Sequence, residues 1–115
     1  MGRQNPGTVK QLSKSLKELF GPVMEKTLFV VSANASPYLL CNLAQEQAEA
    51  FISLVTEGDY DKILTQLQKR RPLPNGTGCT AAVLGMSDRP QAAVLGKSDS
   101  GGDKIVCYTS LSIQL

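Results

Sequence analysis

The chain has 115 residues, of which 42% are hydrophobic and 19% are charged, and this composition is typical of one globular domain. It contains no histidine, which excludes a Ser-His-Asp or Cys-His catalytic site within these residues and every zinc site that needs an imidazole ligand. Twelve basic and ten acidic side chains leave a net charge of +2, which is too small to indicate a nucleic-acid or membrane partner by itself.

The first 26 residues predict a flexible arm over 1–7, followed by a helix that opens a single domain over 8–115. Thr8 offers an N-cap, and apolar residues follow it at helical spacing: Val9, Leu12, Leu16, Leu19 and Phe20. Gly21 and Pro22 end this predicted helix. Its opposite face is basic, at positions i, i+4 and i+7, and carries Lys10, Lys14 and Lys17.

Residues 27–33 (TLFVVSA) are β-branched or aromatic at most positions and do not alternate with polar residues. This pattern predicts a central strand that is covered on both faces. Residues 34–37 form a predicted turn. Residues 38–41 allow two interpretations, a short strand that pairs back as a hairpin or the first turn of the following helix.

Two helices are predicted in the middle of the chain. Asn42 with Gln45 resembles a capping box, and a broad apolar stripe follows it: Leu43, Ala44, Ala48, Phe51, Ile52 and Val55. Gly58 interrupts this helix, and Asp59 caps a shorter one whose apolar stripe is Tyr60, Ile63, Leu64 and Leu67. Cations in a last turn interact favourably with the helix dipole, and here they are Lys69, Arg70 and Arg71.

The last third of the chain loses helical periodicity and is rich in small and turn-forming residues. It predicts strands at 80–86, 91–97 and 104–113 that form an antiparallel meander. An eight-residue pattern occurs twice here, as AAVLGMSD in 81–88 and as AAVLGKSD in 92–99, with seven of eight letters identical. We interpret the two copies as two similar strands, each ended by a glycine and a turn.

No motif predicts a catalytic, cofactor or metal site. The sequence Gly-Lys-Ser at 96–98 resembles the end of a phosphate-binding loop, but the glycine that such a loop needs five positions earlier is replaced by Gln91. Residues 99–103 are too few for a calcium-binding loop and lack its closing glutamate. We therefore expect no enzymatic activity, no cofactor and no metal.

The cysteines are odd in number and lie among apolar or small residues, at Cys41, Cys79 and Cys107. This pattern predicts buried, reduced thiols and a cytoplasmic or nuclear location, with one disulfide and a leftover thiol as the alternative. Uninterrupted apolar runs are no longer than Leu28 to Val31, which is too short to span a bilayer, and we expect no membrane partner.

These elements predict an α+β fold in which two or three helices pack on a four- or five-stranded, mostly antiparallel sheet that ends in a three-stranded meander. In element order alone, the arrangement resembles roadblock and profilin-like domains. The resemblance implies a small adaptor that pairs through sheet edges or helices.

The sequence favours a non-enzymatic protein–protein interaction or adaptor module that self-associates as a homodimer or joins a larger complex. Moderate charge and many small apolar residues suit a protein partner better than a phosphate-rich one. We expect the contacts in 79–86, in 104–113 and on the first helix. The residues predicted to contact a partner are Val9, Leu12, Leu16, Ile105, Tyr108, Leu111 and Ile113.

A small RNA- or DNA-binding domain is the alternative function. Residues 1–26 hold five basic and two acidic side chains, whereas 27–68 hold one basic and five acidic, so the small net charge conceals a basic N-terminal helix. If that helix lies beside the helix that starts at Tyr60, basic residues form a patch that contacts phosphates. The patch would consist of Lys10, Lys14, Lys17, Lys69, Arg70 and Arg71.

Overall fold

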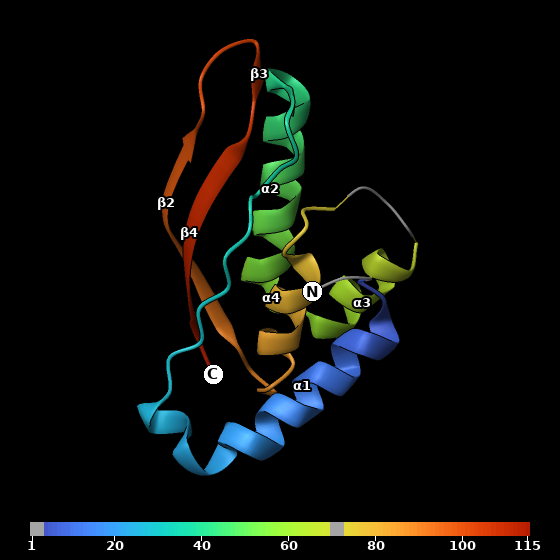
Figure 1. Cartoon of the computed structure of the whole chain (residues 1–115), viewed down its shortest axis with the longest axis vertical. Helices are drawn as coiled ribbons and strands as arrows, with labels where there is room; N and C mark the ends of the chain where they lie inside the picture. The colour runs from blue at the N-terminus through green and yellow to red at the C-terminus, as the bar shows by residue number, and fades with distance from the viewer. Residues whose placement is uncertain (1–3, 70–72) are drawn as a thin grey trace.

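Four α-helices, one 3₁₀ helix and two antiparallel pairs of strands make up residues 4–69 and 73–115, which are the residues that the computed structural model describes. The helices are α1 (Pro6–Phe20), η1 (Gly21–Lys26), α2 (Cys41–Glu57), α3 (Tyr60–Gln68) and α4 (Thr77–Leu84). The strands are β1 (Leu39–Leu40), β2 (Gln91–Asp99), β3 (Lys104–Ile105) and β4 (Cys107–Gln114). β1 pairs with β3 and β2 pairs with β4 (Figure 1), which confirms the α+β class.

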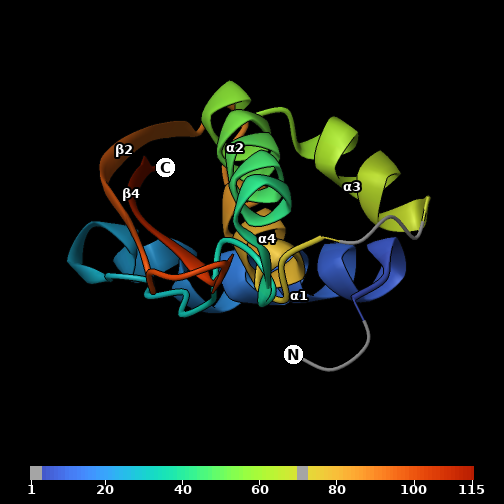
Figure 2. The same cartoon turned by 90° about the horizontal axis from the view of Figure 1, so that it is seen from above.

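Helix α2 lies between the β2–β4 hairpin and the remaining helices (Figure 2). Its buried side chains follow a helical period and contact both strands of the hairpin as well as α3 and α4; they are Ala44, Ala48, Phe51, Ile52 and Val55. Helix α1 crosses the base of the molecule, where it contacts α3 and α4. The hydrophobic core therefore has one wall of strands and three of helices.

Helix α4 is enclosed on all sides. Seven of its eight residues are buried, and its side chains are apolar or small in every direction. A helix without a polar face is stable only where neighbours cover its whole circumference, and α1, α2 and α3 all contact it. At its start, the hydroxyl of Thr77 donates to the carbonyl of Pro74 at 2.7 Å, so a polar group inside the core is paired.

The starts of α1 and α2 differ from the predicted ones. The Asn5 side chain caps α1 by accepting a hydrogen bond from the Thr8 backbone N–H at 2.9 Å, so the helix begins before the predicted Thr8 cap. Residues 1–3 of the predicted flexible arm lie outside the described residues. Helix α2 begins at Cys41 after Leu40, which makes no side-chain capping bond, so the capping box predicted at Asn42 is wrong.

The remaining turns in the middle of the chain follow their sequence signals. Gly58 ends α2 in the left-handed conformation, with φ of 67°, which glycine adopts without steric cost. Asp59 caps α3 as predicted, because its carboxylate accepts a hydrogen bond from the Lys62 backbone N–H at 3.0 Å. Both interpretations of 38–41 hold in part, since Leu39 and Leu40 pair with β3 and Cys41 starts α2.

The predicted single sheet with a three-stranded meander is not found. Strands 91–97 and 104–113 are present as β2 and as β3 with β4, but most of 80–86 belongs to α4. A short apolar run does not distinguish a buried strand from a buried helix, and here the helix satisfies its own backbone hydrogen bonds in a site closed on all sides. The element order that resembled roadblock domains is lost with this strand.

Residues 27–34, which we call the extended segment, are not the central strand that the sequence predicts. They are extended but pair with no strand among the described residues. Their odd-numbered side chains are partly buried and their even-numbered ones are exposed, with Leu28 86% and Val30 81% accessible. One face is therefore uncovered, and the apolar residues that suggested burial on both faces lie in solvent.

The two copies of the repeat adopt different structures. The copy at 81–88 lies in α4 and the turn after it, whereas the copy at 92–99 lies in β2. Their equivalent glycines also differ: a methyl group at Gly85 would lie 2.6 Å from the Ser13 hydroxyl and 2.6 Å from the Tyr60 ring, whereas at Gly96 nothing lies within 4 Å. Gly85 thus permits α1, α3 and the end of α4 to meet.

We expect Gly85→Ala to lower the free energy of unfolding by about 1–3 kcal/mol, because the added methyl group overlaps side chains of α1 and α3. Gly96→Ala is the matched control, since it adds the same methyl group in open space and reduces the freedom of the unfolded chain; we expect it to be neutral or to stabilise by up to about 1 kcal/mol. Urea unfolding followed by circular dichroism measures both. Equal losses in the two variants would contradict the close helix contact.

Candidate functional site

An apolar cleft of about 620 Å³ lies between the extended segment, the β2–β4 hairpin and the helices. The extended segment contributes Leu28 and its odd-numbered residues: Thr27, Phe29, Val31 and Ala33. The opposite wall is formed by Ser112, by alternate residues of β4 and by the residue after it: Thr109, Leu111, Ile113 and Leu115. Phe51 of α2 and Val83 of α4 also line it. The cleft is thus walled by two extended stretches of chain.

Large apolar side chains stand exposed around this cleft. Leu28 and Leu95 both line it and are 86% and 69% accessible, and Val30 lies on the outer face of the same extended segment. Single exposed apolar residues are common on soluble proteins, but several around one cleft mark a surface that has not been covered.

The extended segment is anchored at both ends. At the upper end, the Ala35 N–H donates to the Cys107 carbonyl at 2.9 Å, and the Cys107 N–H donates to the buried Ser36 hydroxyl at 2.9 Å. At the lower end, the rings of Phe20 and Phe29 pack edge to face with centroids 5.4 Å apart. The cleft is therefore a wedge that is closed at Cys107 and open towards the end of α1.

The outer edge of β2 is free along the part of the chain that the structure describes, because β2 pairs only with β4. An irregularity between Val94 and Gly96 divides this edge. Beyond it, Lys97 pairs with Glu49 of α2 at 2.9 Å and places charge on the strand. Bulges and lysines protect sheet edges from unwanted pairing, so Gln91 to Val94 is the more open half of this edge.

The partner-binding residues predicted from sequence do not gather on one surface. Val9 and Ile105 are 0% and 1% accessible and belong to the core, so their side chains cannot reach a partner in this structure. Leu12, Leu16, Leu111 and Ile113 are partly buried, and only Tyr108 is exposed. The stretch 79–86 lies mostly within the buried helix α4. Leu111 and Ile113 do line the cleft.

The exposed residues around the cleft were missed because an unbroken apolar run was interpreted as burial on both faces. Leu28 and Val30 belong to that run, and Leu95 belongs to the repeat that we interpreted as two similar strands. The turn-forming residues after Leu95 and the proline at 37 indicate where a strand or helix ends. They do not indicate which face of that element other residues cover. No signal in a single sequence marks these residues as exposed.

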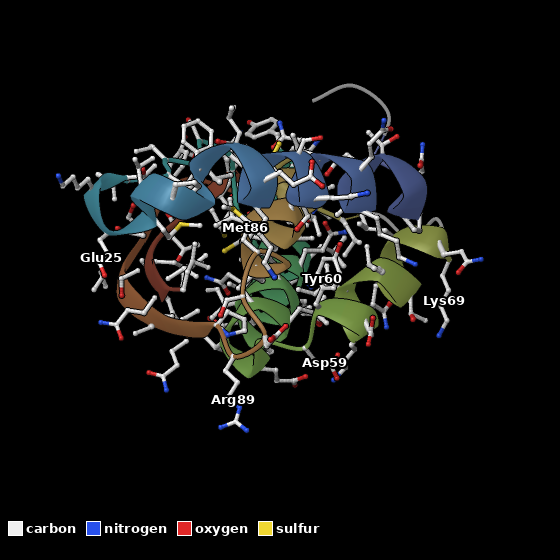
Figure 3. The ribbon with its side chains drawn as sticks, turned by 90° about the horizontal axis from the view of Figure 1, so that it is seen from below. Glu25, Asp59, Tyr60, Lys69, Met86 and Arg89 are labelled. Atoms are coloured by element: carbon white, nitrogen blue, oxygen red, sulfur yellow. The ribbon has the colours of Figure 1, made fainter. Side chains whose placement is uncertain are left out.

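The basic residues predicted for nucleic acid are exposed on α1 and at the end of α3. Lys10, Lys14 and Lys17 are exposed, and Lys14 lies 3.8 Å from Glu18. Lys69, which follows α3, projects outward (Figure 3), and α1 contacts α3 as the alternative required. Arg70 and Arg71 lie outside the described residues.

Among the residues that the structure describes, Tyr60 and Lys62 have shifted pKa values, and both shifts have structural causes. Burial raises the pKa of Tyr60, the Ser13 hydroxyl offsets part of this by hydrogen bonding to the phenol, and the charge of Asp61 adds to the rise. The pKa of Lys62 is raised by its hydrogen bond to the Glu57 carboxylate at 2.6 Å. Neither group lies in the cleft, so neither supplies acid–base chemistry there.

All three cysteines are free thiols, so the disulfide of the alternative interpretation is not found. Cys41 and Cys79 are partly buried, and Cys107 is buried. Within residues 4–69 and 73–115, no three His, Cys, Asp or Glu side chains are grouped so as to hold a metal ion. No helix in these ranges combines the length and the apolar character needed to cross a membrane.

No protein-family model matches this chain, and no curated protein or solved structure is significantly similar to it.

We expect stability to fall above pH 10, because the raised pKa of Tyr60 means that the folded state holds the phenolic proton more tightly than the unfolded state does. This stabilisation is complete below the unfolded pKa and is lost as pH rises through the folded one; Lys62 acts in the same direction. Tyr60→Phe removes the phenol's contribution, so its urea midpoint should fall less than that of the wild type between about pH 9 and about pH 11. Identical losses would rule out the contribution of Tyr60.

Proposed function

We propose that this chain is a non-enzymatic protein–protein interaction module that self-associates or joins a larger complex. The observation that carries the proposal is the group of exposed apolar residues around one cleft, namely Leu28, Val30 and Leu95. Leaving such side chains in water is costly, and burial against a partner recovers that free energy.

The free edge of β2 supports self-association in particular. A strand edge offers unpaired N–H and C=O groups to another strand, and two copies of one edge pair antiparallel about a two-fold axis. Pairing over Gln91 to Val94 joins two hairpins into a four-stranded sheet without disturbing the charged half of the edge. The same contact brings the Leu95 side chains of both copies to the interface.

Apolar burial and strand pairing have different parts in the proposed dimer. Complete burial of a leucine or valine side chain stabilises by about 1.5–3 kcal/mol, so three such residues in each of two copies contribute about 9–18 kcal/mol at most. Association costs about 4–15 kcal/mol in lost freedom. Because these ranges overlap, apolar burial alone does not ensure a stable dimer, and backbone hydrogen bonds of β2 add affinity and fix the orientation.

Sedimentation velocity over a concentration series tests the proposal. We expect a monomer–dimer equilibrium that Leu95→Lys weakens at least tenfold, because a charge at the interface must be desolvated. Leu43→Lys is the matched control: Leu43 is 44% accessible on α2 but does not line the cleft, and this variant should associate as the wild type does. Circular dichroism checks that both variants stay folded.

Two outcomes would contradict the proposal. One is a wild-type chain that stays monomeric at the highest concentration and retains no partner when it is purified from cells. The other is equal weakening by the two lysine variants, which would show that the effect is one of general charge. If the wild-type chain stays monomeric but retains a partner that the Leu95→Lys variant loses, the result supports the form of the proposal in which the chain joins a larger complex.

Nucleic-acid binding is the second candidate, and the contact between α1 and α3 favours it, because the exposed lysines lie on α1 and Lys69 directly follows α3. Such binding should weaken about 100-fold between about 50 and 200 mM salt if four phosphates are contacted. Fluorescence anisotropy with a labelled single-stranded RNA and a DNA duplex measures it. The double variant Lys10→Glu/Lys17→Glu should abolish binding, whereas Lys104→Glu on β3 should not. An absence of binding at low salt rejects this candidate.

A further inference from the structure

The extended segment runs along β4 without the hydrogen bonds of a strand. Among the described residues, backbone hydrogen bonds hold Thr27 and Ala35 at its two ends, and none involves the backbone of 28–34. Both stretches line the same cleft. Seven consecutive residues therefore present unpaired donors and acceptors beside a strand whose far edge is also unpaired from Thr109 onward.

One existing contact fixes the register in which these two stretches face each other. The Ala35 N–H donates to the Cys107 carbonyl at 2.9 Å, as in an antiparallel pair. In an antiparallel ladder, each step backward along one strand corresponds to a step forward along the other. The pairs that continue this contact are Ala33 with Thr109, Val31 with Leu111 and Phe29 with Ile113.

All six of these residues line the cleft. Phe51 of α2 and Val83 of α4 line the same cleft, so the side chains of the segment and those of β4 both lie on the side of the helices. Residues that face each other in a ladder lie on the same side of the sheet, so pairing in this register needs no side chain to change face. A shift by one residue would turn Phe29 and Val31 out to solvent.

The backbone of β4 is oriented for the same pairing. Cys107 directs its N–H and C=O towards Ser36 and Ala35, on the side away from β2. Successive residues of a strand direct these groups to alternate edges, so Thr109, Leu111 and Ile113 also direct theirs away from β2 and towards the extended segment. Their partners on the segment are the groups of Ala33, Val31 and Phe29.

We propose that residues 29–35 close onto β4 as a third strand, which converts the hairpin into a three-stranded antiparallel sheet and fills the cleft. Ala33 is the pivot, because it packs so closely on Gly76 that no side chain fits there. The packing of Phe29 on Phe20 holds the lower end apart from β4, and its release permits closure. The proposal is independent of self-association, since closure leaves the outer edge of β2 free.

Amide hydrogen exchange of the full chain tests the closed register, and the segment contains its own control. We expect the amides of Phe29, Val31 and Ala33, which face β4, to exchange at least tenfold more slowly than those of Val30 and Ser32, which face solvent. The amides of Leu111 and Ile113 should be protected as well. Nuclear Overhauser contacts between the α-protons of Ser32 and Ser110 provide a second measure, because closure brings these Cα atoms to about 4.5 Å.

Two proline variants make a matched pair. Val31→Pro removes an N–H that faces β4, whereas Val30→Pro removes one that faces solvent, and neither N–H makes a backbone hydrogen bond in the present structure. We expect Val31→Pro to increase exchange at Leu111 and Ile113 at least tenfold and Val30→Pro to leave it unchanged. Phe20→Ala should act in the opposite direction and slow exchange at Phe29 and Val31 about two- to tenfold, because it removes the aromatic contact that holds the wedge open.

Uniformly fast exchange over 29–33 with unprotected Leu111 and Ile113 would overturn the proposal. Protection at Val30 and Ser32 in place of Phe29 and Val31 would also overturn it, since that pattern belongs to a register shifted by one residue. Equal effects of the two proline variants would show that β4 is protected by something other than this segment.

Discussion

Helix α4 imposes the constraint on which the rest of the fold depends, because it has no polar side. Its eight residues are apolar or small in every direction, so each part of its surface needs a neighbour. Helices α1, α2 and α3 supply that cover, and Gly85 at its end lets Ser13 and Tyr60 approach to a distance that no methyl group would permit. Helices α1, α2 and α3 therefore enclose α4, and less of their surface is left to pack on the strands.

This use of the helices leaves the strands incompletely covered. Among the described residues, α2 alone makes several contacts with both strands of the β2–β4 hairpin, so one face of the hairpin and the outer edge of β2 remain in solvent. The same shortage of cover leaves Leu28, Val30 and Leu95 exposed around the cleft. The surface proposed for interaction is thus a consequence of how the core is built: the enclosed helix takes the neighbours that a strand surface would need.

The repeat shows how far sequence could predict this fold. Periodicity and capping signals located α2, α3, the Asp59 cap and both strands of the hairpin, because those segments are amphipathic or follow clear turn residues. The four letters AAVL are helical at 81–84 and form a strand at 92–95, so their structure is decided by surroundings that the letters do not contain. For the same reason, Val9 and Ile105 were predicted as contacts: apolar periodicity identifies a face that must be covered, but not whether the core or a partner covers it.

The two edges of the hairpin differ in what lies beside them, and this difference bears on the proposed function. The far edge of β4 faces the extended segment, whose alternation of buried and exposed side chains fits the register proposed above. A strand from the same chain would therefore compete with any partner for this edge. In the part of the chain that the structure describes, no such segment lies beside the edge of β2, and the protection of this edge is limited to the irregularity after Val94 and the paired charge of Lys97. Val30 lies on an even position that stays outward whether or not the segment closes, and Leu28 precedes the residues that close. Closure would therefore remove the cleft while preserving the apolar surface and the β2 edge, so that the conformational change and the interface can coexist in one molecule.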